Sequence, residues 1–283
     1  MMTLPKVLPI IDISKGRKLA SISRDFVLPG LPSGKVAILS APGGTGKSFL
    51  LLELALAVAS GEPVISGIMP SAAGPTRYIS FEEDETDIHN RLVALFQTFP
   101  ISPPVETFFC SALEGGNLPL VQNGEKNEEA VEYLEGICEG MRLAIFDPLS
   151  RLHESDENSN SEMKKLMQVL ISTARKTRCA IVVAHHTSKS AVLNGQGGLQ
   201  QSARGASCLV DDPRLVCTLS RRSTPLDKKS QYEDEEDDDQ RLVLTWAKMN
   251  GCKPIKPMEL VRTPSGVIVA NNGSDSLYGG MYE

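Results

Sequence analysis

Short apolar runs alternate along the chain with longer segments whose apolar residues recur at helical spacing. Buried strands are predicted over residues 36–40, 77–81, 108–111, 143–147 and 180–184. Helices are predicted between them, over residues 48–60, 86–98, 128–139 and 161–176. Strands that read as continuous apolar runs between amphipathic helices are typical of a parallel sheet covered on both faces. The pattern therefore predicts an α/β fold.

The pattern changes after His186. Residues 187–201 are rich in Gly, Ser and Gln and show no period, which predicts a loop. Two antiparallel hairpins are predicted after it, one joining 215–219 with 241–246 and the other joining 258–263 with 267–270. We expect an N-terminal leader over residues 1–33, a single domain over 34–270 and a flexible tail over 271–283.

The composition is that of an ordinary globular chain, with 283 residues, 41% hydrophobic and 23% charged side chains. These values exclude global disorder, collagen and coiled coil. The longest apolar stretch, residues 49–59, is interrupted by Glu53 and is too short to span a bilayer, and no export signal marks the N-terminus. Six scattered cysteines, with no pair at metal-ligand spacing, favour a reduced cytoplasmic protein with no membrane partner.

The formal net charge of −6 is unevenly distributed. Seven consecutive acidic residues, 233–239, leave a net charge of only +1 on the rest of the chain. An acidic run of this kind is typical of a solvated loop. The net charge therefore neither indicates nor excludes a nucleic-acid partner.

Residues 41–48 carry the strongest chemical signal in the chain. They match the phosphate-binding loop pattern, except that Ala41 replaces its first Gly, and a predicted strand precedes them and a predicted helix follows. Glycines let successive backbone N–H groups turn inward as an anion nest at the start of the helix. We expect this loop to bind ATP and Mg²⁺. Its predicted ligands are Pro42, Gly43, Gly44, Thr45, Gly46, Lys47, which reaches the β- and γ-phosphates, and Ser48, whose hydroxyl ligates Mg²⁺.

Acidic residues end two of the other predicted strands. Asp147 closes the strand over 143–147, where an acid can hold Mg²⁺ through its water shell. Glu82 is the first acid after the strand over 77–81, and we expect it to be the catalytic base; Glu83 is the alternative.

Two consecutive histidines, His185 and His186, follow the strand over 180–184. A polar residue at this strand end can contact the γ-phosphate and transmit its presence to the loop that follows. We favour His186 as this sensor, because His185 continues the strand and is expected to point into the sheet.

These residues, in this order, resemble the RecA-like ATPases and, within them, the RepA-type hexameric replicative helicases of broad-host-range plasmids. The similar segments are 40–48, 78–83, 88–89, 91–92, 146–151, 185–189, 200–207, 209–211, 238–241 and 248–250. The resemblance implies a RecA-like P-loop NTPase core with a mainly parallel central sheet and C-terminal antiparallel hairpins. It also implies a homohexameric ring that binds ATP between neighbouring subunits.

The resemblance implies further site residues. Arg214 lies where an arginine finger from the neighbouring subunit is expected, and Arg204 and Lys248 are further candidate interfacial cations. A guanidinium beside the γ-phosphate offsets the charge that develops in the transition state. The loop over 187–201 is the candidate contact to single-stranded DNA, with Lys189 as its phosphate-binding cation.

We therefore expect an ATP-dependent replicative DNA helicase of a bacterial plasmid or phage type that translocates on single-stranded DNA. A replication initiator or a primase is the expected further partner. Two alternatives stay open: a RecA-like recombination or repair ATPase that forms filaments, and a nucleotide-gated loader without helicase activity.

Overall fold

The computed structural model describes residues 24–65, 68–101, 103, 105–187, 207–222 and 240–271. Its helices are α2 (Lys47–Ser60), α3 (Glu85–Thr98), α4 (Glu128–Cys138), α5 (Asn160–Thr177) and the short α7 (Cys208–Asp211), with 3₁₀ turns η1 (Val105–Thr107) and η2 (Leu149–Arg151). The strands of its main sheet are β3 (Val36–Ala41), β4 (Thr76–Ser80), β5 (Phe108–Ala112), β8 (Leu143–Asp147), β9 (Ala180–His186), β10 (Leu215–Arg221), β11 (Arg241–Met249), β12 (Met258–Arg262) and β13 (Ile268–Ala270). Two small hairpins complete the description, β1 (Phe26–Leu28) with β2 (Leu31–Pro32) and β6 (Val121–Gln122) with β7 (Glu125–Lys126).

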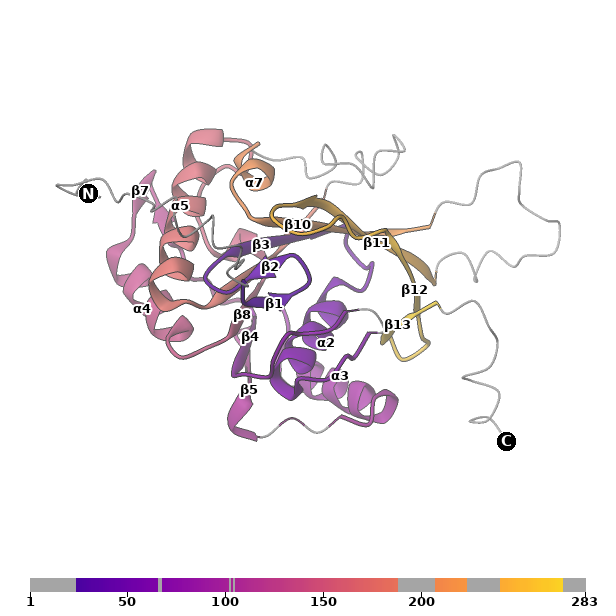
Figure 1. Cartoon of the computed structure of the whole chain (residues 1–283). Helices are drawn as coiled ribbons and strands as arrows, with labels where there is room; N and C mark the ends of the chain where they lie inside the picture. Colours follow the sequence, from indigo (N-terminus) through magenta and orange to yellow (C-terminus); the bar gives the residue numbers. More distant parts are fainter. Residues whose placement is uncertain are drawn as a thin grey trace, which may run out of the picture.

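The described strands of the main sheet follow the order β13-β12-β11-β10-β3-β9-β8-β4-β5 (Figure 1). The strands from β10 to β5 are parallel, and the strands from β10 to β13 pair antiparallel. The predicted parallel sheet and both C-terminal hairpins are therefore confirmed. In this order the carboxyl ends of β3, β9, β8 and β4 meet at one edge, where ligands bind in open α/β sheets.

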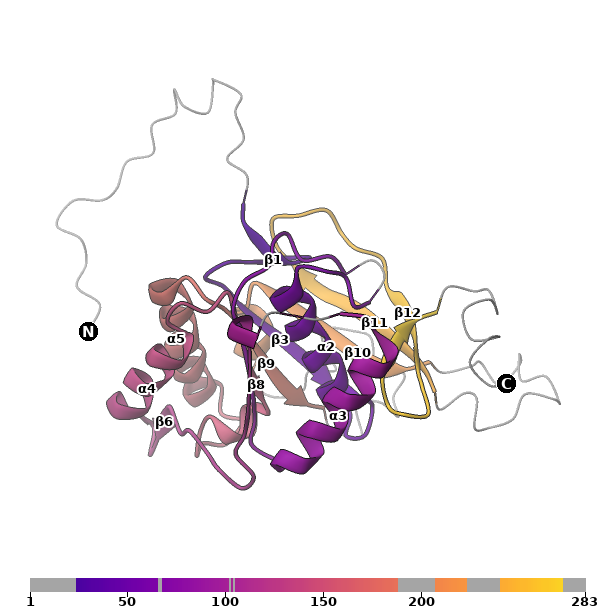
Figure 2. The ribbon, with the colours of Figure 1, turned by 90° about the horizontal axis from the view of Figure 1, so that it is seen from below.

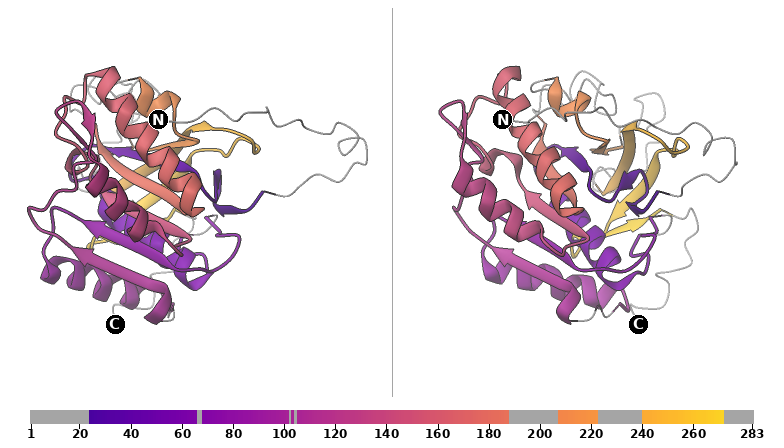
Figure 3. Two further views of the ribbon diagram at one scale, coloured as in Figure 1. Left: turned by 90° about the vertical axis from the view of Figure 1, so that its left-hand side faces the viewer. Right: turned by 60° about the vertical axis from the view of Figure 1, so that its left-hand side comes forward.

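Side chains of the central strands alternate between the two faces of the sheet and build two separate cores. Leu39 and Ile145 belong to the core under α2 and α3, whereas Ile38 and Phe146 belong to the core under α4 and α5. Figure 2 shows α2 and α3 in front of the sheet, and Figure 3 shows the two helix pairs on opposite faces. Because both faces are covered, β3, β8 and β9 are mainly apolar runs, with polar residues near their carboxyl ends, rather than alternating patterns.

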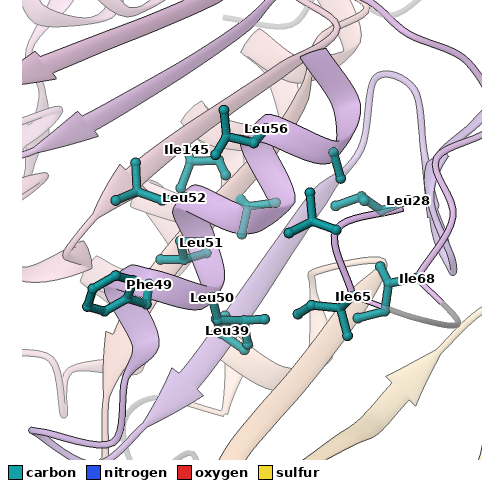
Figure 4. Packing of buried hydrophobic residues seen from close by; sticks show 14 of the residues in the cluster. Leu28, Leu39, Phe49, Leu50, Leu51, Leu52, Leu56, Ile65, Ile68 and Ile145 are labelled. Carbon is teal, nitrogen blue, oxygen red and sulfur yellow. The ribbon is translucent and has the colours of Figure 1, made fainter. Parts of the chain in front are cut away.

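Helix α2 is apolar on nearly every side because it is buried on nearly every side. It begins after Gly46 and ends at Gly61, both with positive φ, and the Gly61 N–H donates to Ala57 O at 2.8 Å. In Figure 4 its leucines meet Ile145 of the sheet and Ile65 of the segment that follows the helix. This burial fixes the helix, and with it the loop that precedes it.

The expected leader over residues 1–33 is partly incorrect, because its last residues belong to the folded domain. Strands β1 and β2 form a hairpin around Gly30, and Val27 and Leu31 are fully buried in the core that contains α2. The strands are too short to show a period in the sequence. For the same reason β6 and β7 were not predicted.

No helix in the described ranges combines the length and apolarity needed to cross a membrane.

A buried acid on α2 anchors the C-terminal hairpin of β12 and β13. Glu53 is fully buried, and its Oε1 accepts the Ile268 backbone N–H at 2.8 Å. Its Oε2 has no hydrogen-bond partner among the described residues. Burial raises the pKa of Glu53 well above its ordinary value of 4.5, so the carboxyl group favours its neutral form.

This burial predicts how stability depends on pH. The folded pKa of Glu53 lies above the unfolded value, so the stability that protonation contributes is complete below about pH 4.5 and declines as pH rises toward the folded pKa. Glu53→Gln stays neutral and keeps an acceptor for Ile268. As pH rises above about 4.5, we expect the Tm of Glu53→Gln to fall less than the Tm of the wild type. Between the unfolded and the folded pKa of Glu53, the free energy of unfolding of the variant should rise relative to that of the wild type by about 1.4 kcal/mol per pH unit. Parallel Tm curves for the wild type and Glu53→Gln, with exposed Glu62→Gln as control, would contradict the neutral state.

Candidate functional site

Four chemistry-bearing positions predicted from separate parts of the sequence meet at the carboxyl edge of the sheet. The phosphate loop follows β3, His186 ends β9, Asp147 ends β8 and Glu82 follows β4. Strand register places them side by side, with Ala41 opposite His186 and Asp147 opposite the last residue of β4. The carboxyl ends of these strands therefore gather a phosphate loop, two acids and a histidine within one site.

The phosphate loop has the backbone of an anion nest. Gly44 and Gly46 have φ of 74° and 99°, and helix α2 begins directly after them at Lys47. No side chain among the described residues caps the start of α2 and no acid lies in its first turn, so its first N–H groups remain available to a ligand. A Cβ placed at Gly43 or Gly44 would meet no described atom within 4 Å apart from those of the adjoining residues, which leaves open space above the loop. The loop fits a polyphosphate.

Asp147 is the centre of a compact polar network. Its Oδ1 accepts from Lys47 Nζ at 2.5 Å, and its Oδ2 accepts from Ser48 Oγ at 2.8 Å and from Tyr78 Oη at 3.1 Å. Hydroxyl and carboxylate oxygens are the ligands that Mg²⁺ prefers. The predicted metal residues Ser48 and Asp147 therefore fit this ion.

Tyr78 was not predicted to belong to the site. It lies inside β4 and reads as an ordinary core aromatic, and only the pairing of β4 with β8 brings its hydroxyl to Asp147. Burial, and then the negative charge of Asp147, raise the pKa of Tyr78 well above its ordinary value. The neutral hydroxyl fixes the orientation of the carboxylate.

The structure separates the roles of the two consecutive glutamates. The side chain of Glu83 is 14% exposed and pairs with the Arg91 guanidinium, which also stacks over the Phe49 ring at 4.6 Å. The side chain of Glu82 is 47% exposed, and its Oε2 lies 3.8 Å from His186 Nε2. Burial raises the pKa of Glu83, against the opposing charge of Arg91. Glu82 is therefore the carboxylate that is accessible at this edge, which supports it over Glu83 as the base.

The two histidines differ in exposure. His185 is buried, with Nε2 3.4 Å from Glu157 Oε2, whereas His186 is exposed at the edge of the sheet. The imidazole of His186 is half-buried, and this partial burial, followed by the positive charge of Lys47, lowers its pKa, which favours a neutral ring at pH 7. A neutral ring can donate one N–H to a phosphate oxygen.

Glu157 joins His185 to a second buried histidine, and sequence reasoning did not find this cluster. His153 Nε2 lies 3.5 Å from Glu157 Oε1, and the proximity of His153, and then of His185, lowers the pKa of Glu157. Residues 153 and 157 follow β8, and the strand order places them beside the end of β9. The cluster connects the segment after Asp147 to the strand that carries His186.

Two of the predicted interfacial cations, Arg214 and Lys248, lie within the described residues. Both lie near the amino ends of the parallel strands, opposite the ends that carry the phosphate loop. The Arg214 backbone N–H donates to Val36 O at 2.9 Å, at the start of β3 rather than at its phosphate-loop end. At about 3.3 Å per residue, the length of β3 separates Arg214 from its own loop by about 20 Å. Arg214 is therefore too far away to complete the site of its own subunit.

Lys248 is held by its own chain. It lies opposite Val216 near the start of β10, and its Nζ donates to Val210 O at 3.0 Å and also to Asp211 O. Burial lowers the pKa of Lys248. In this position the ammonium stabilises the last carbonyls of α7.

Several predicted features lie outside the described residues. They are the loop over 187–201 after Thr187, with Lys189, then Arg204, the acidic run over 233–239 and the tail over 271–283 after Asn271.

Comparisons with known proteins agree with this architecture. The solved structure of an ATPase domain from another protein matches with a TM-score of 0.59 over 91% of this chain and 95% of that chain, at 12% sequence identity. At this identity the match shows the fold, and it confirms the predicted RecA-like core with a mainly parallel sheet and antiparallel C-terminal strands. A family model described as "AAA domain" (AAA_25) matches residues 17–192. Because that model spans more than half of the chain, this protein belongs to the AAA domain family.

Proposed function

We propose that this protein hydrolyses ATP at the subunit interfaces of a ring and translocates on single-stranded DNA as a replicative helicase of the RepA type. One observation carries the proposal: Arg214 lies at the amino ends of the parallel strands, and the phosphate loop lies at their carboxyl ends. A second copy whose strand amino ends face the strand carboxyl ends of the first would bring its Arg214 to this loop. A closed series of such contacts forms a ring.

The residues at the carboxyl edge divide the work of hydrolysis. Lys47 and the N–H groups of the loop would hold the phosphates, and Ser48 and Asp147, which lie together beside Lys47, would hold Mg²⁺, an ion that neutralises phosphate charge. Glu82 accepts a proton from the attacking water. These roles are consistent with the exposure of Glu82 and the burial of Asp147.

His186 connects this site to DNA in the proposal. The neutral imidazole donates to the terminal phosphate, and residues 187–201, which include Lys189, follow it directly in the sequence. A loop placed there would change its position with the nucleotide state and would hold the DNA backbone through Lys189. A replication initiator or a primase remains the proposed partner of the ring.

The proposal is tested by measuring particle mass and shape with a non-hydrolysable ATP analogue, with and without single-stranded DNA. We expect closed rings, hydrolysis that DNA stimulates, and separation of a forked duplex with ATP. Helical filaments that cover the DNA would support the recombination or repair ATPase instead. Intact ATP binding with near-zero turnover, even with DNA, would support the nucleotide-gated loader.

A further inference from the structure

Arg262, at the end of β12, lies directly against the phosphate loop of its own subunit. Its Nη1 donates a hydrogen bond to Gly44 O at 2.8 Å. No carboxylate of the described residues forms an ion pair with its guanidinium. A cation without a charged partner in the described part of the chain therefore contacts the backbone of the loop, 218 residues away in the sequence.

The hydrogen bond to the Gly44 carbonyl restrains a peptide that would otherwise be free to change its orientation. Gly44 has a φ of 74°, and apart from its chain neighbours no described atom lies within 4 Å of the position that its Cβ would occupy. Glycine moves readily between backbone conformations, so without an outside contact the peptide that joins residues 44 and 45 is weakly restrained. The hydrogen bond from Arg262 supplies such a restraint.

The restraint determines where an N–H group points. In a trans peptide the C=O and N–H bonds point in opposite directions, so a Gly44 carbonyl held toward the hairpin turns the Thr45 N–H into the loop. There this N–H makes a long bond, 3.4 Å, to Pro42 O. It can therefore turn to an anion, as the N–H groups of a phosphate loop do.

The hairpin that carries Arg262 is itself fixed on α2. Ile268 Cδ1 lies 3.1 Å from the position of a Cβ at Gly46, and Gly266 packs so closely on the Phe49 ring that a Cβ there would lie 2.5 Å from it. The hydrogen bond from Ile268 to the buried acid of α2 adds a third contact. Figures 1 and 2 show the hairpin beside α2. The guanidinium is therefore presented from a rigid support.

We propose that Arg262 is a positioning residue of the nucleotide site, which acts within its own subunit and holds the Gly44–Thr45 peptide in its phosphate-binding orientation. The inference rests on the proposed binding of ATP at this loop. Because loop N–H groups cradle the α- and β-phosphates, which ATP and ADP share, Arg262 supports both nucleotides equally. This role differs from that of Arg214, which is proposed to act from the neighbouring subunit on the terminal phosphate.

The test is a titration of Arg262→Ala with a fluorescent ADP and a fluorescent non-hydrolysable ATP analogue, each with Mg²⁺. Loss of one charge-assisted hydrogen bond should raise Kd for both nucleotides by about tenfold or more. The KM for ATP should rise in parallel, and kcat at saturating ATP should stay close to the wild-type value. Arg262→Lys keeps a cationic donor and should recover most of the affinity.

Arg222→Ala is the matched control. Arg222 is an exposed arginine that pairs with Glu259 of the strand that carries Arg262, and it has no hydrogen bond to the phosphate loop in the described residues. Its removal should leave both Kd values unchanged. Equal affinity in Arg262→Ala and the wild type would overturn the proposal, and so would a Kd increase of the same size in Arg222→Ala.

Two further outcomes separate this role from others. Weaker binding of the ATP analogue with unchanged ADP binding would overturn the positioning role, because Arg262 would then contact the terminal phosphate itself. Lys47→Ala tests the underlying site: if it binds both nucleotides as the wild type does, the proposed nucleotide site is wrong. If Lys47→Ala loses binding and Arg262→Ala does not, only the role of Arg262 is wrong.

Discussion

Glu82→Gln should bind ATP as the wild type does and hydrolyse it at least about 10²-fold more slowly, the scale of general-base losses. The substitution keeps the size of the side chain but removes its ability to accept a proton. Glu82 stands at the accessible end of β4, beside His186, and its substitution breaks no hydrogen bond between described side chains. Steady-state phosphate release gives kcat, and titration with a labelled nucleotide gives Kd.

Glu83→Gln is the matched control for this prediction, because the two residues are adjacent and chemically identical. Glu83 is committed to Arg91 and is largely enclosed, so its substitution should loosen that pair and lower kcat far less. A kcat that collapses in Glu83→Gln and survives in Glu82→Gln would identify Glu83 as the base.

Arg214→Ala should lower ATP hydrolysis by about 10³-fold or more, the contribution of arginine fingers in related phosphoryl-transfer sites. Arg214 lies at the amino ends of the parallel strands, far from the phosphate loop of its own subunit, so nucleotide binding within the subunit should persist. The comparison is with Lys47→Ala, which should also be inactive because it lacks the cation that holds the phosphates. Both variants are measured by phosphate release above the assembly concentration.

A mixture of these two inactive variants should regain activity. Arg214→Ala subunits keep the loop and Lys47→Ala subunits keep the finger, so a mixed assembly contains interfaces that join one intact half to the other. Recovery should be partial and should disappear on dilution. If mixed assembly is demonstrated by mass and no activity returns, Arg214 does not act between subunits.

Most of the fold could be predicted from the sequence because its strands are buried on both faces. Strands such as β3 and β8 therefore each contain a run of four apolar residues, which stands out from the amphipathic α4 and α5. The β1–β2 hairpin could not be predicted, because two or three residues per strand carry no period. Its membership in the core depends on tertiary contacts that Val27 and Leu31 make with residues distant in the sequence.

The site residues also divide into those that the sequence predicts and those that only the structure identifies. Asp147 and Glu82 could be proposed from the sequence because Asp147 ends one predicted strand and Glu82 directly follows another. Tyr78, Arg262 and Glu157 were missed because each reaches the site through pairing or packing between distant segments. An interior tyrosine and a strand-end arginine look the same in the sequence wherever they lie in the sheet.

Because β10 pairs parallel with β3, Arg214 lies at the amino end of the strands and the phosphate loop at their carboxyl ends; in the proposed assembly the first surface donates the arginine and the second accepts it. Joined through these surfaces, copies assemble head to tail, and every junction has the same direction. An open chain then has one incomplete site at its end, whereas a closed ring has none. Specific activity should therefore rise with each added subunit and reach its maximum only when the ring closes. The turnover rate per subunit then measures how complete the assembly is.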